Sequence, residues 1–68
     1  MVQIFGKDTC PYTQAALDHY RNRGVDVDYR NVKKDPAALT EMLQASHGKR
    51  EVPVIVEAGE VTIGFGGT

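Results

Sequence analysis

Cys10 is the single cysteine of the 68-residue chain and lies in the stretch DTCPYT, residues 8–13. A second cysteine at position 13 would complete the C-x-x-C motif of dithiol redox proteins, but Thr13 occupies that position. One nucleophilic sulfur is enough for thiol–disulfide exchange when the partner brings the second thiol. The stretch therefore predicts either a redox site with one cysteine or a small buried cysteine that precedes a helix.

The residues around Cys10 favour the reactive alternative. Pro11 predicts that a helix begins directly after Cys10, because proline is favoured at the first helical position. The unpaired N–H groups and the positive dipole end of such a helix stabilise a thiolate and lower the pKa of the thiol below its usual ~8.5. Lys7 adds a positive charge, and Thr13 offers a hydroxyl or a backbone N–H to the sulfur. We therefore predict that Cys10 is the nucleophile and that Lys7 and Thr13 assist it.

Composition and charge exclude several classes of function. The chain has the length of one small domain, residues 1–68, and its 41% hydrophobic and 25% charged residues are ordinary for a soluble globular protein. No apolar run approaches the roughly 20 residues of a membrane span, and the start of the chain does not resemble a signal peptide. A net charge of −1 without blocks of like charge argues against nucleic acid or a membrane as partner.

The lone cysteine also bears on location and on metals. It rules out an internal disulfide framework, and without an export signal it predicts a cytoplasmic protein. A structural zinc site needs four ligands, which Cys10 and the scattered His19 and His47 do not supply. We expect no metal site.

Periodicity and turn residues predict six elements in the order β-α-β-α-β-β. The predicted strands cover residues 2–5, 25–29, 52–56 and 61–63, and the predicted helices run from residue 11 to 22 and from residue 36 to about 48. Alternation of apolar and charged residues in 25–29 indicates a half-exposed strand at a sheet edge. Asp35 followed by Pro36 predicts the capped start of the second helix.

These elements predict a four-stranded mixed sheet. The first β-α-β unit is expected to be a right-handed crossover between parallel strands, and the last two strands to form a hairpin that turns at Ala58–Gly59. The two helices can cover one face of the sheet or one face each. Pro53 lacks a ladder donor, so from the residues alone the simpler prediction is the first position of a strand rather than a cis peptide bond.

Together these features resemble the glutaredoxins. The resemblance is carried by KDTCPY at 7–12, Asp35-Pro36, Glu41-Met42, Val52-Pro53 and Ile63-Gly64, and it covers nearly the whole chain in the right order and spacing. It implies the α/β thioredoxin fold, with the bond before Pro53 cis and Pro53 facing Cys10. It also implies a thiol–disulfide oxidoreductase that uses glutathione as co-substrate and has no tightly bound cofactor.

The resemblance assigns roles to residues at both ends of the chain. Cys10 would be the nucleophile, Lys7 would hold the thiolate and bind one glutathione carboxylate, and Tyr12 would flank the sulfur and shape the glutathione groove. Glutathione itself and glutathionylated or disulfide-bearing proteins would be the partners.

Three further contacts with glutathione are implied. The backbone of Val52, just before Pro53, would pair with the cysteine of glutathione. Gly66 and Gly67 would offer N–H groups to the second carboxylate, as an anion-binding nest does.

The sequence departs from the family in ways that leave alternatives open. Thr13 restricts Cys10 to monothiol exchange. Ile63-Gly64-Phe65 is also similar to small electron donors that depend on thioredoxin reductase, and the acidic residue usual near position 68 is missing. A glutathione-assisted iron–sulfur module is a further alternative, although Pro11-Tyr12 does not match the small residue found after the cysteine in such proteins.

The family normally continues into a final helix, which this sequence lacks after Thr68. Without it, one sheet face is expected to be poorly covered or covered by a partner chain, which predicts a monomer or a weak dimer. This end would be explained if the chain is cut before a selenocysteine whose in-frame UGA codon is read as a stop, or before a cysteine. An adaptor domain with an inert cysteine is the remaining alternative.

Overall fold

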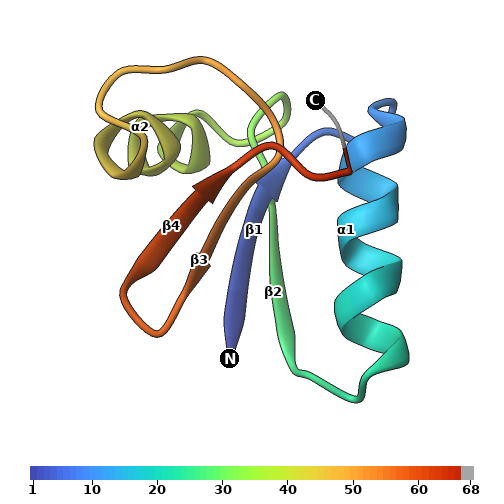
Figure 1. The fold of residues 1–68 in the computed structure, drawn as a ribbon. Coiled ribbons are helices and arrows are strands. Elements are labelled where there is room, and N and C mark those ends of the chain that lie inside the picture. Colours follow the sequence, from blue (N-terminus) through green and yellow to red (C-terminus); the bar gives the residue numbers. More distant parts are fainter. Residues whose placement is uncertain (67–68) are drawn as a thin grey trace.

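The computed structural model describes residues 1–66 and contains four strands and two helices in the predicted order (Figure 1). They are β1 (Val2–Gly6), α1 (Pro11–Asn22), β2 (Val27–Asn31), α2 (Pro36–Ala45), β3 (Val54–Glu57) and β4 (Glu60–Ile63). The strands form one sheet in the order β2-β1-β3-β4. β1 and β2 are parallel, whereas β3 is antiparallel to both β1 and β4. The mixed sheet, the hairpin and the edge position of the second strand are therefore confirmed.

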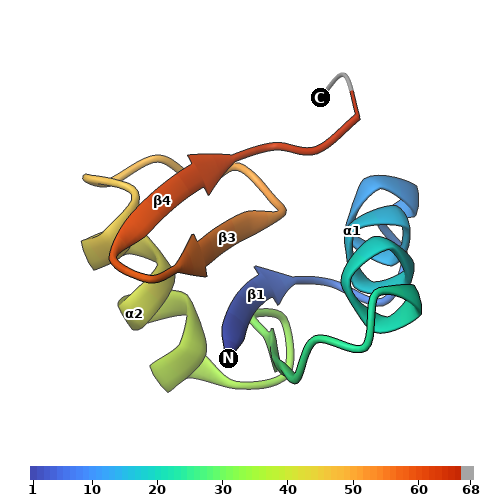
Figure 2. The same cartoon turned by 60° about the horizontal axis from the view of Figure 1, so that its bottom comes forward.

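The central strand β1 is buried on both faces, and this decides where the helices lie. Ile4 is 0% exposed and packs in the cluster under α1, whereas the next residue, Phe5, is 2% exposed and packs in the cluster under α2. Successive side chains of a strand point to opposite faces. The two helices therefore cover one face each, an arrangement that is visible from two directions (Figures 1 and 2).

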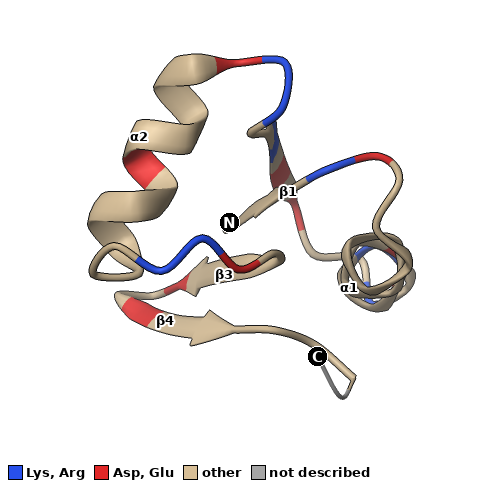
Figure 3. Cartoon of the chain, turned by 90° about the horizontal axis from the view of Figure 1, so that it is seen from above, with Lys and Arg blue, Asp and Glu red and all other residues tan. Residues whose placement is uncertain are grey.

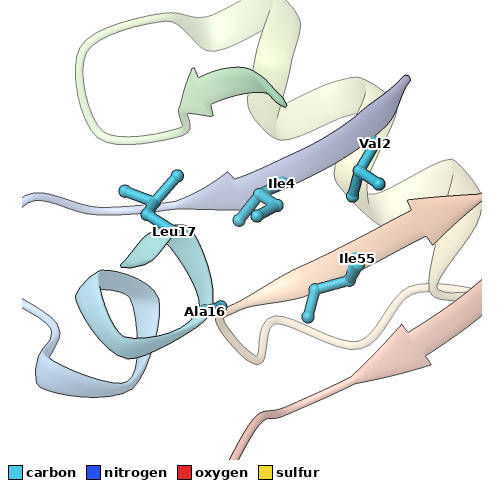
Figure 4. Close-up of a cluster of buried hydrophobic side chains, with 5 residues drawn as sticks. All are labelled: Val2, Ile4, Ala16, Leu17 and Ile55. Atoms are coloured by element: carbon cyan, nitrogen blue, oxygen red, sulfur yellow. The ribbon is translucent and has the colours of Figure 1, made fainter. Parts of the chain in front are cut away.

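The cluster on the α1 face joins Val2, Ile4, Ala16, Leu17 and Ile55 (Figure 4). Phe65 packs against it and also contacts the ring of His19, with 5.3 Å between ring centroids. The chain after β4 crosses toward α1 to reach this position (Figures 1 and 2). Ile55 is consequently only 3% exposed. The five clustered side chains are thus buried, whereas the apolar side chains that pack against them are only partly buried, namely Tyr20, Val25, Val27, Tyr29 and Phe65. The expectation that a partner chain covers this face stays a prediction.

The helix ends follow the capping residues. Asp35 caps α2, and its carboxylate accepts a hydrogen bond from the Ala37 N–H at 3.0 Å. α2 ends at Ala45, earlier than predicted, because the chain turns at His47 and Gly48, which both have positive φ. α1 has the predicted bounds, and Gly24, at φ +73°, follows its end.

Two strands begin later than predicted. β2 starts at Val27, which pairs with the first residue of β1, and β3 starts at Val54, which pairs with Phe5. Pairing with β1 defines these bounds, and the apolar alternation of a single strand does not contain that information. Neither helix of the described residues 1–66 is long and apolar enough to cross a membrane.

The Asp35 cap provides a test of this local structure. We expect Asp35→Ala to lower the free energy of unfolding by about 1 kcal/mol, because the Ala37 N–H loses its acceptor. Asp35→Asn keeps an acceptor oxygen and should remain close to the wild type. Urea unfolding of the three proteins measures the difference, and equal losses in both variants would contradict a capping role.

Candidate active site around Cys10

Cys10 lies between the end of β1 and the start of α1, as the N-cap residue of the helix. Its N–H donates to the Lys7 carbonyl at 3.2 Å, and its carbonyl accepts from the Gln14 N–H at 3.1 Å. Only 8% of the residue is exposed. The sulfur is thus held at the surface of the fold, at the positive end of a 12-residue helix.

The surroundings of Cys10 lower the pKa of its thiol. Burial is the largest single influence and raises the pKa, because a thiolate is poorly solvated there. Interactions with the Thr13 side chain, with the Thr13 and Tyr12 N–H groups and with the Lys7 charge act in the opposite direction and together outweigh burial. The predicted assistance from Lys7 and Thr13 therefore has a physical basis, and Cys10 is suited to react as a thiolate.

The Thr13 side chain fills a tight space under the site. It is 0% exposed, and its hydroxyl makes no hydrogen bond within ordinary distance and angle limits, although it still lowers the pKa of Cys10. Both observations fit a long or bent contact with sulfur, which is a large and weak acceptor. Thr13 also packs directly on Gly6 of β1, where an added Cβ would overlap its side chain. The glycine at position 6 thus provides the room that Thr13 occupies.

The sheet brings the segment around Pro53 to the same end as Cys10. Val54 pairs with Phe5, so residues 52–53 lie beside the end of β1, from which the Cys10 loop departs. The Val52–Pro53 peptide bond is cis, and the Pro53 carbonyl accepts from the Gly64 N–H at 2.7 Å. A cavity of about 180 Å³ lies next to this segment and is lined by Glu51, Val52, Ile63 and Gly64. A ligand bound there would lie along the Val52 backbone.

The remaining predicted residues lie at the surface. Tyr12 is 40% exposed on the first turn of α1, and Lys7 is half-buried on the loop before it. Gly66 is exposed, has φ +69° and lies beyond β4. Gly67, the other predicted contact of the second carboxylate, lies outside the described residues. Tyr12 and Lys7 thus flank the Cys10 loop.

The loops at this end of the molecule carry charges of both signs (Figure 3). The loops from β1 to α1, β2 to α2 and α2 to β3 all open at the Cys10 end of the sheet. They carry five of the eight basic residues, Lys7, Lys33, Lys34, Lys49 and Arg50. Asp26, Glu57 and Glu60 lie at the opposite end, near the start of β2 and in the hairpin. The same three loops also carry Asp8, Asp35 and Glu51, so the rim of the site is mixed in sign with an excess of two positive charges (five basic against three acidic residues).

One group near the site was missed by sequence reasoning. The Tyr29 hydroxyl donates to the Asp8 carboxylate at 2.8 Å, and the Lys34 ammonium lies 3.5 Å from the other oxygen of that carboxylate. The residues come from three segments, and only the parallel pairing of β1 with β2 brings them together. Among the described residues 1–66, no group of three or more Cys, His, Asp or Glu side chains is arranged to hold a metal ion.

The contact between Gly6 and Thr13 can be tested by a double-mutant cycle. We expect Gly6→Ala to destabilise the protein by about 1–3 kcal/mol, because the new methyl group overlaps Thr13. In the Thr13→Ala background the same change should cost clearly less, since most of the overlapping atoms are gone. Chemical denaturation of the four proteins gives the coupling energy. Additive effects would show that the two residues do not press on each other.

The Tyr29 hydroxyl should also affect stability at alkaline pH. Burial first, and then the hydrogen bond to Asp8 and its charge, raise the pKa of Tyr29 to about 12. The unfolded value is about 10, so the folded state holds the phenol proton more tightly. This stabilisation is complete below about pH 10 and is lost as the pH rises toward about 12. Tyr29→Phe should therefore lose stability less steeply over that window.

Thermal unfolding across the alkaline range tests this expectation. Tyr20→Phe removes a hydroxyl elsewhere and serves as the control, because it retains the contact between Tyr29 and Asp8. Identical alkaline profiles for the wild type and Tyr29→Phe would refute the assignment.

Comparison with solved structures supports the fold. The thioredoxin-like protein BC3987 matches with a TM-score of 0.85 and 26% identity, over 97% of this chain and 89% of that chain. The glutaredoxin-like NrdH-redoxin from Escherichia coli matches with a TM-score of 0.80 and 26% identity, over 94% and 82%. A glutaredoxin from Archaeoglobus fulgidus matches with a TM-score of 0.79 and 23% identity, over 96% and 75%. The thioredoxin fold predicted from the sequence is therefore confirmed.

Sequence comparison gives a more specific result. No curated protein sequence matches the chain significantly. The family model described as Glutaredoxin, however, matches residues 2–62, which include Cys10, both helices and most of the sheet. Together with the reactive cysteine at the start of α1, this match shows that the chain belongs to the glutaredoxin family.

Proposed function

We propose that this glutaredoxin acts as a glutathione-dependent thiol–disulfide oxidoreductase in which Cys10 alone performs monothiol exchange. The observation that carries the proposal is the environment of Cys10. The thiol lies at the N-cap of α1 with a lowered pKa, and the position of a resolving cysteine is filled by the buried Thr13. Cys10 is also the only cysteine in the sequence. Each catalytic cycle in this proposal therefore needs a second thiol from a partner molecule.

The exchange then takes two displacement steps. The Cys10 thiolate attacks the glutathione sulfur of a mixed disulfide, forms a Cys10–glutathione disulfide and releases the substrate thiolate, which takes up a proton. A thiolate of a second glutathione attacks the same glutathione sulfur, forms oxidised glutathione and regenerates the Cys10 thiolate. In the net reaction the mixed disulfide and one reduced glutathione become the substrate thiol and one oxidised glutathione, so one disulfide bond is exchanged for another.

Glutathione fits the chemistry of the surrounding surface. It carries two carboxylates, and the loops at the Cys10 end bear Lys7 and four further basic residues. The segment before Pro53 offers the Val52 backbone for a short pairing with the glutathione cysteine, and the cavity of about 180 Å³ begins there. Tyr12, exposed on the first turn of α1, would flank the bound sulfur. Gly66 and Gly67 would supply N–H groups to the second carboxylate.

A second candidate is reduction by thioredoxin reductase instead of glutathione. The similarity to the NrdH-redoxin of Escherichia coli favours it, since that glutaredoxin-like protein is described as having a thioredoxin-like activity profile. Glu51, which lines the cavity beside Val52, also favours it, because a carboxylate there repels an anionic ligand. Against it stands Thr13, since a single cysteine cannot close the internal disulfide that such a carrier passes to a reductase.

One assay separates these candidates. Reduction of a small glutathione mixed disulfide is followed with glutathione and glutathione reductase, and in parallel with thioredoxin reductase alone. We expect turnover only with glutathione, and we expect Cys10→Ser to fall to the uncatalysed background because no nucleophile remains. Arg23→Ala, at the far end of α1, is the control and should keep the wild-type rate.

The outcomes are distinct. Equal rates for the wild type and Cys10→Ser would refute the enzymatic role. Turnover with thioredoxin reductase alone would replace glutathione as the reductant and leave Cys10 as the nucleophile.

A further inference from the structure

The loop that carries Cys10 is fastened through Asp8, which stands two residues before the cysteine. The Asp8 carboxylate accepts a hydrogen bond from the Tyr29 hydroxyl at 2.8 Å and lies 3.5 Å from the Lys34 ammonium. The Asp8 carbonyl also accepts from the Gln14 side chain at 3.2 Å. Asp8 is therefore contacted from three other parts of the chain, which are strand β2, the loop after it and helix α1.

Local structure explains why Tyr29 and Lys34 reach Asp8. Tyr29 pairs with Ile4 in the parallel ladder, and both strands run toward the Cys10 end of the sheet. Asn31 ends β2, and its side-chain oxygen accepts from the Lys33 and Lys34 N–H groups at 3.0 and 3.2 Å. This turn directs the chain back over the site, so that Lys34 lies beside the carboxylate.

Asp8 and Cys10 stand two positions apart in the same loop, so a charge on Asp8 bears on the ionisation of Cys10. A carboxylate close to a thiolate disfavours the thiolate, because like charges repel. Tyr29 and Lys34 act on this carboxylate: the Tyr29 hydrogen bond is the largest influence on the pKa of Asp8 and lowers it, slight burial opposes this, and the Lys34 charge lowers it further. Asp8 is therefore ionised at neutral pH, and its two partners, Tyr29 and Lys34, offset part of its negative charge.

The protonation state of Tyr29 stays the same over the pH range in which Cys10 ionises. Its pKa of about 12 keeps the phenol protonated, so it remains a donor over the whole working range of a thiolate. A charge on Cys10 is a minor further influence that raises the pKa of Tyr29. The other charges acting here are Lys7 on Cys10 and Arg21 on Tyr29.

We propose that Tyr29 and Lys34 are positioning residues for the nucleophile: they bind Asp8, hold the loop that carries Cys10 and offset a carboxylate charge that would otherwise disfavour the thiolate. Neither residue contacts a substrate in this role. A purely structural ion pair is a poor alternative, because the Asp8 and Lys34 side chains are 53% and 79% exposed and such pairs contribute little to folding. The proposal rests on Cys10 as the nucleophile of the proposed function, but not on glutathione as its reductant.

Alkylation of the single cysteine by iodoacetamide as a function of pH tests the proposal. We expect the midpoint of the rate profile to move to higher pH in Tyr29→Phe and in Lys34→Ala, and the rate below the midpoint to fall roughly two- to fivefold, since one pKa unit corresponds to a factor of ten. Asp8→Asn removes the carboxylate charge and should not raise the midpoint. Lys33→Ala is the matched control, because its side chain forms no ion pair with Asp8 among the described residues.

The double variant Asp8→Asn/Tyr29→Phe decides between charge and structure. If Tyr29 acts by offsetting the Asp8 charge, the midpoint of the double variant equals that of Asp8→Asn. An upward shift that persists without the carboxylate, or an unchanged midpoint in Tyr29→Phe, would overturn the proposal. Thermal unfolding of each variant confirms that it is folded, and glutathione is absent from the assay, so a different physiological reductant does not affect the result.

Discussion

The chemistry of this protein depends on the N–H groups that the first turn of α1 leaves without a backbone acceptor. A helix that begins directly after a strand points these groups at the connecting loop, and here Cys10 stands at that position. The pKa of the thiol is lowered because the Thr13 side chain, the Thr13 and Tyr12 N–H groups and the Lys7 charge together stabilise the thiolate more than burial opposes it. Moving the cysteine by one residue would separate it from these groups. The strand, the turn and the proline at the helix start therefore serve one function, which is to keep a single sulfur reactive.

The site also depends on close packing between β1 and α1. Gly6 and Thr13 occupy complementary volumes, since Thr13 fills the space that a side chain at position 6 would take. Thr13 is thus more than a missing resolving cysteine: it supports the end of β1 and brings a hydroxyl near the sulfur. This double role links the site to the core beneath it.

Much of the fold follows from short-range signals in the sequence. The bounds of α1 and the start of α2 depend on neighbouring residues, such as Pro11 after Cys10 and the Asp35 cap, and were predictable for that reason. The starts of β2 and β3 depend on pairing with β1, and the choice of faces depends on Ile4 and Phe5 packing under different helices. A single strand does not contain that information.

The candidate site likewise combines residues that have a local sequence signal with residues that have none. Cys10, Lys7 and Thr13 are close in sequence and could be recognised from helix physics, whereas the contact of Asp8 with Tyr29 joins residues 21 positions apart and has no local signal. The segment around Pro53 was found through family resemblance, because the residues alone favoured an ordinary strand start.

The separation of charge along the sheet has a consequence for how the molecule meets its partners. The Cys10 end carries five basic and three acidic residues, and the opposite end carries Asp26, Glu57 and Glu60 together with Arg21 and Arg23, so the chain has a small electric dipole moment along the sheet although its net charge is only −1. An anionic partner exerts a torque on such a molecule before contact and turns the cysteine toward itself. This torque acts over about 10 Å in 0.1 M salt and weakens as salt is added. An anionic partner would thus meet the Cys10 end more often than the opposite end, before any groove is occupied.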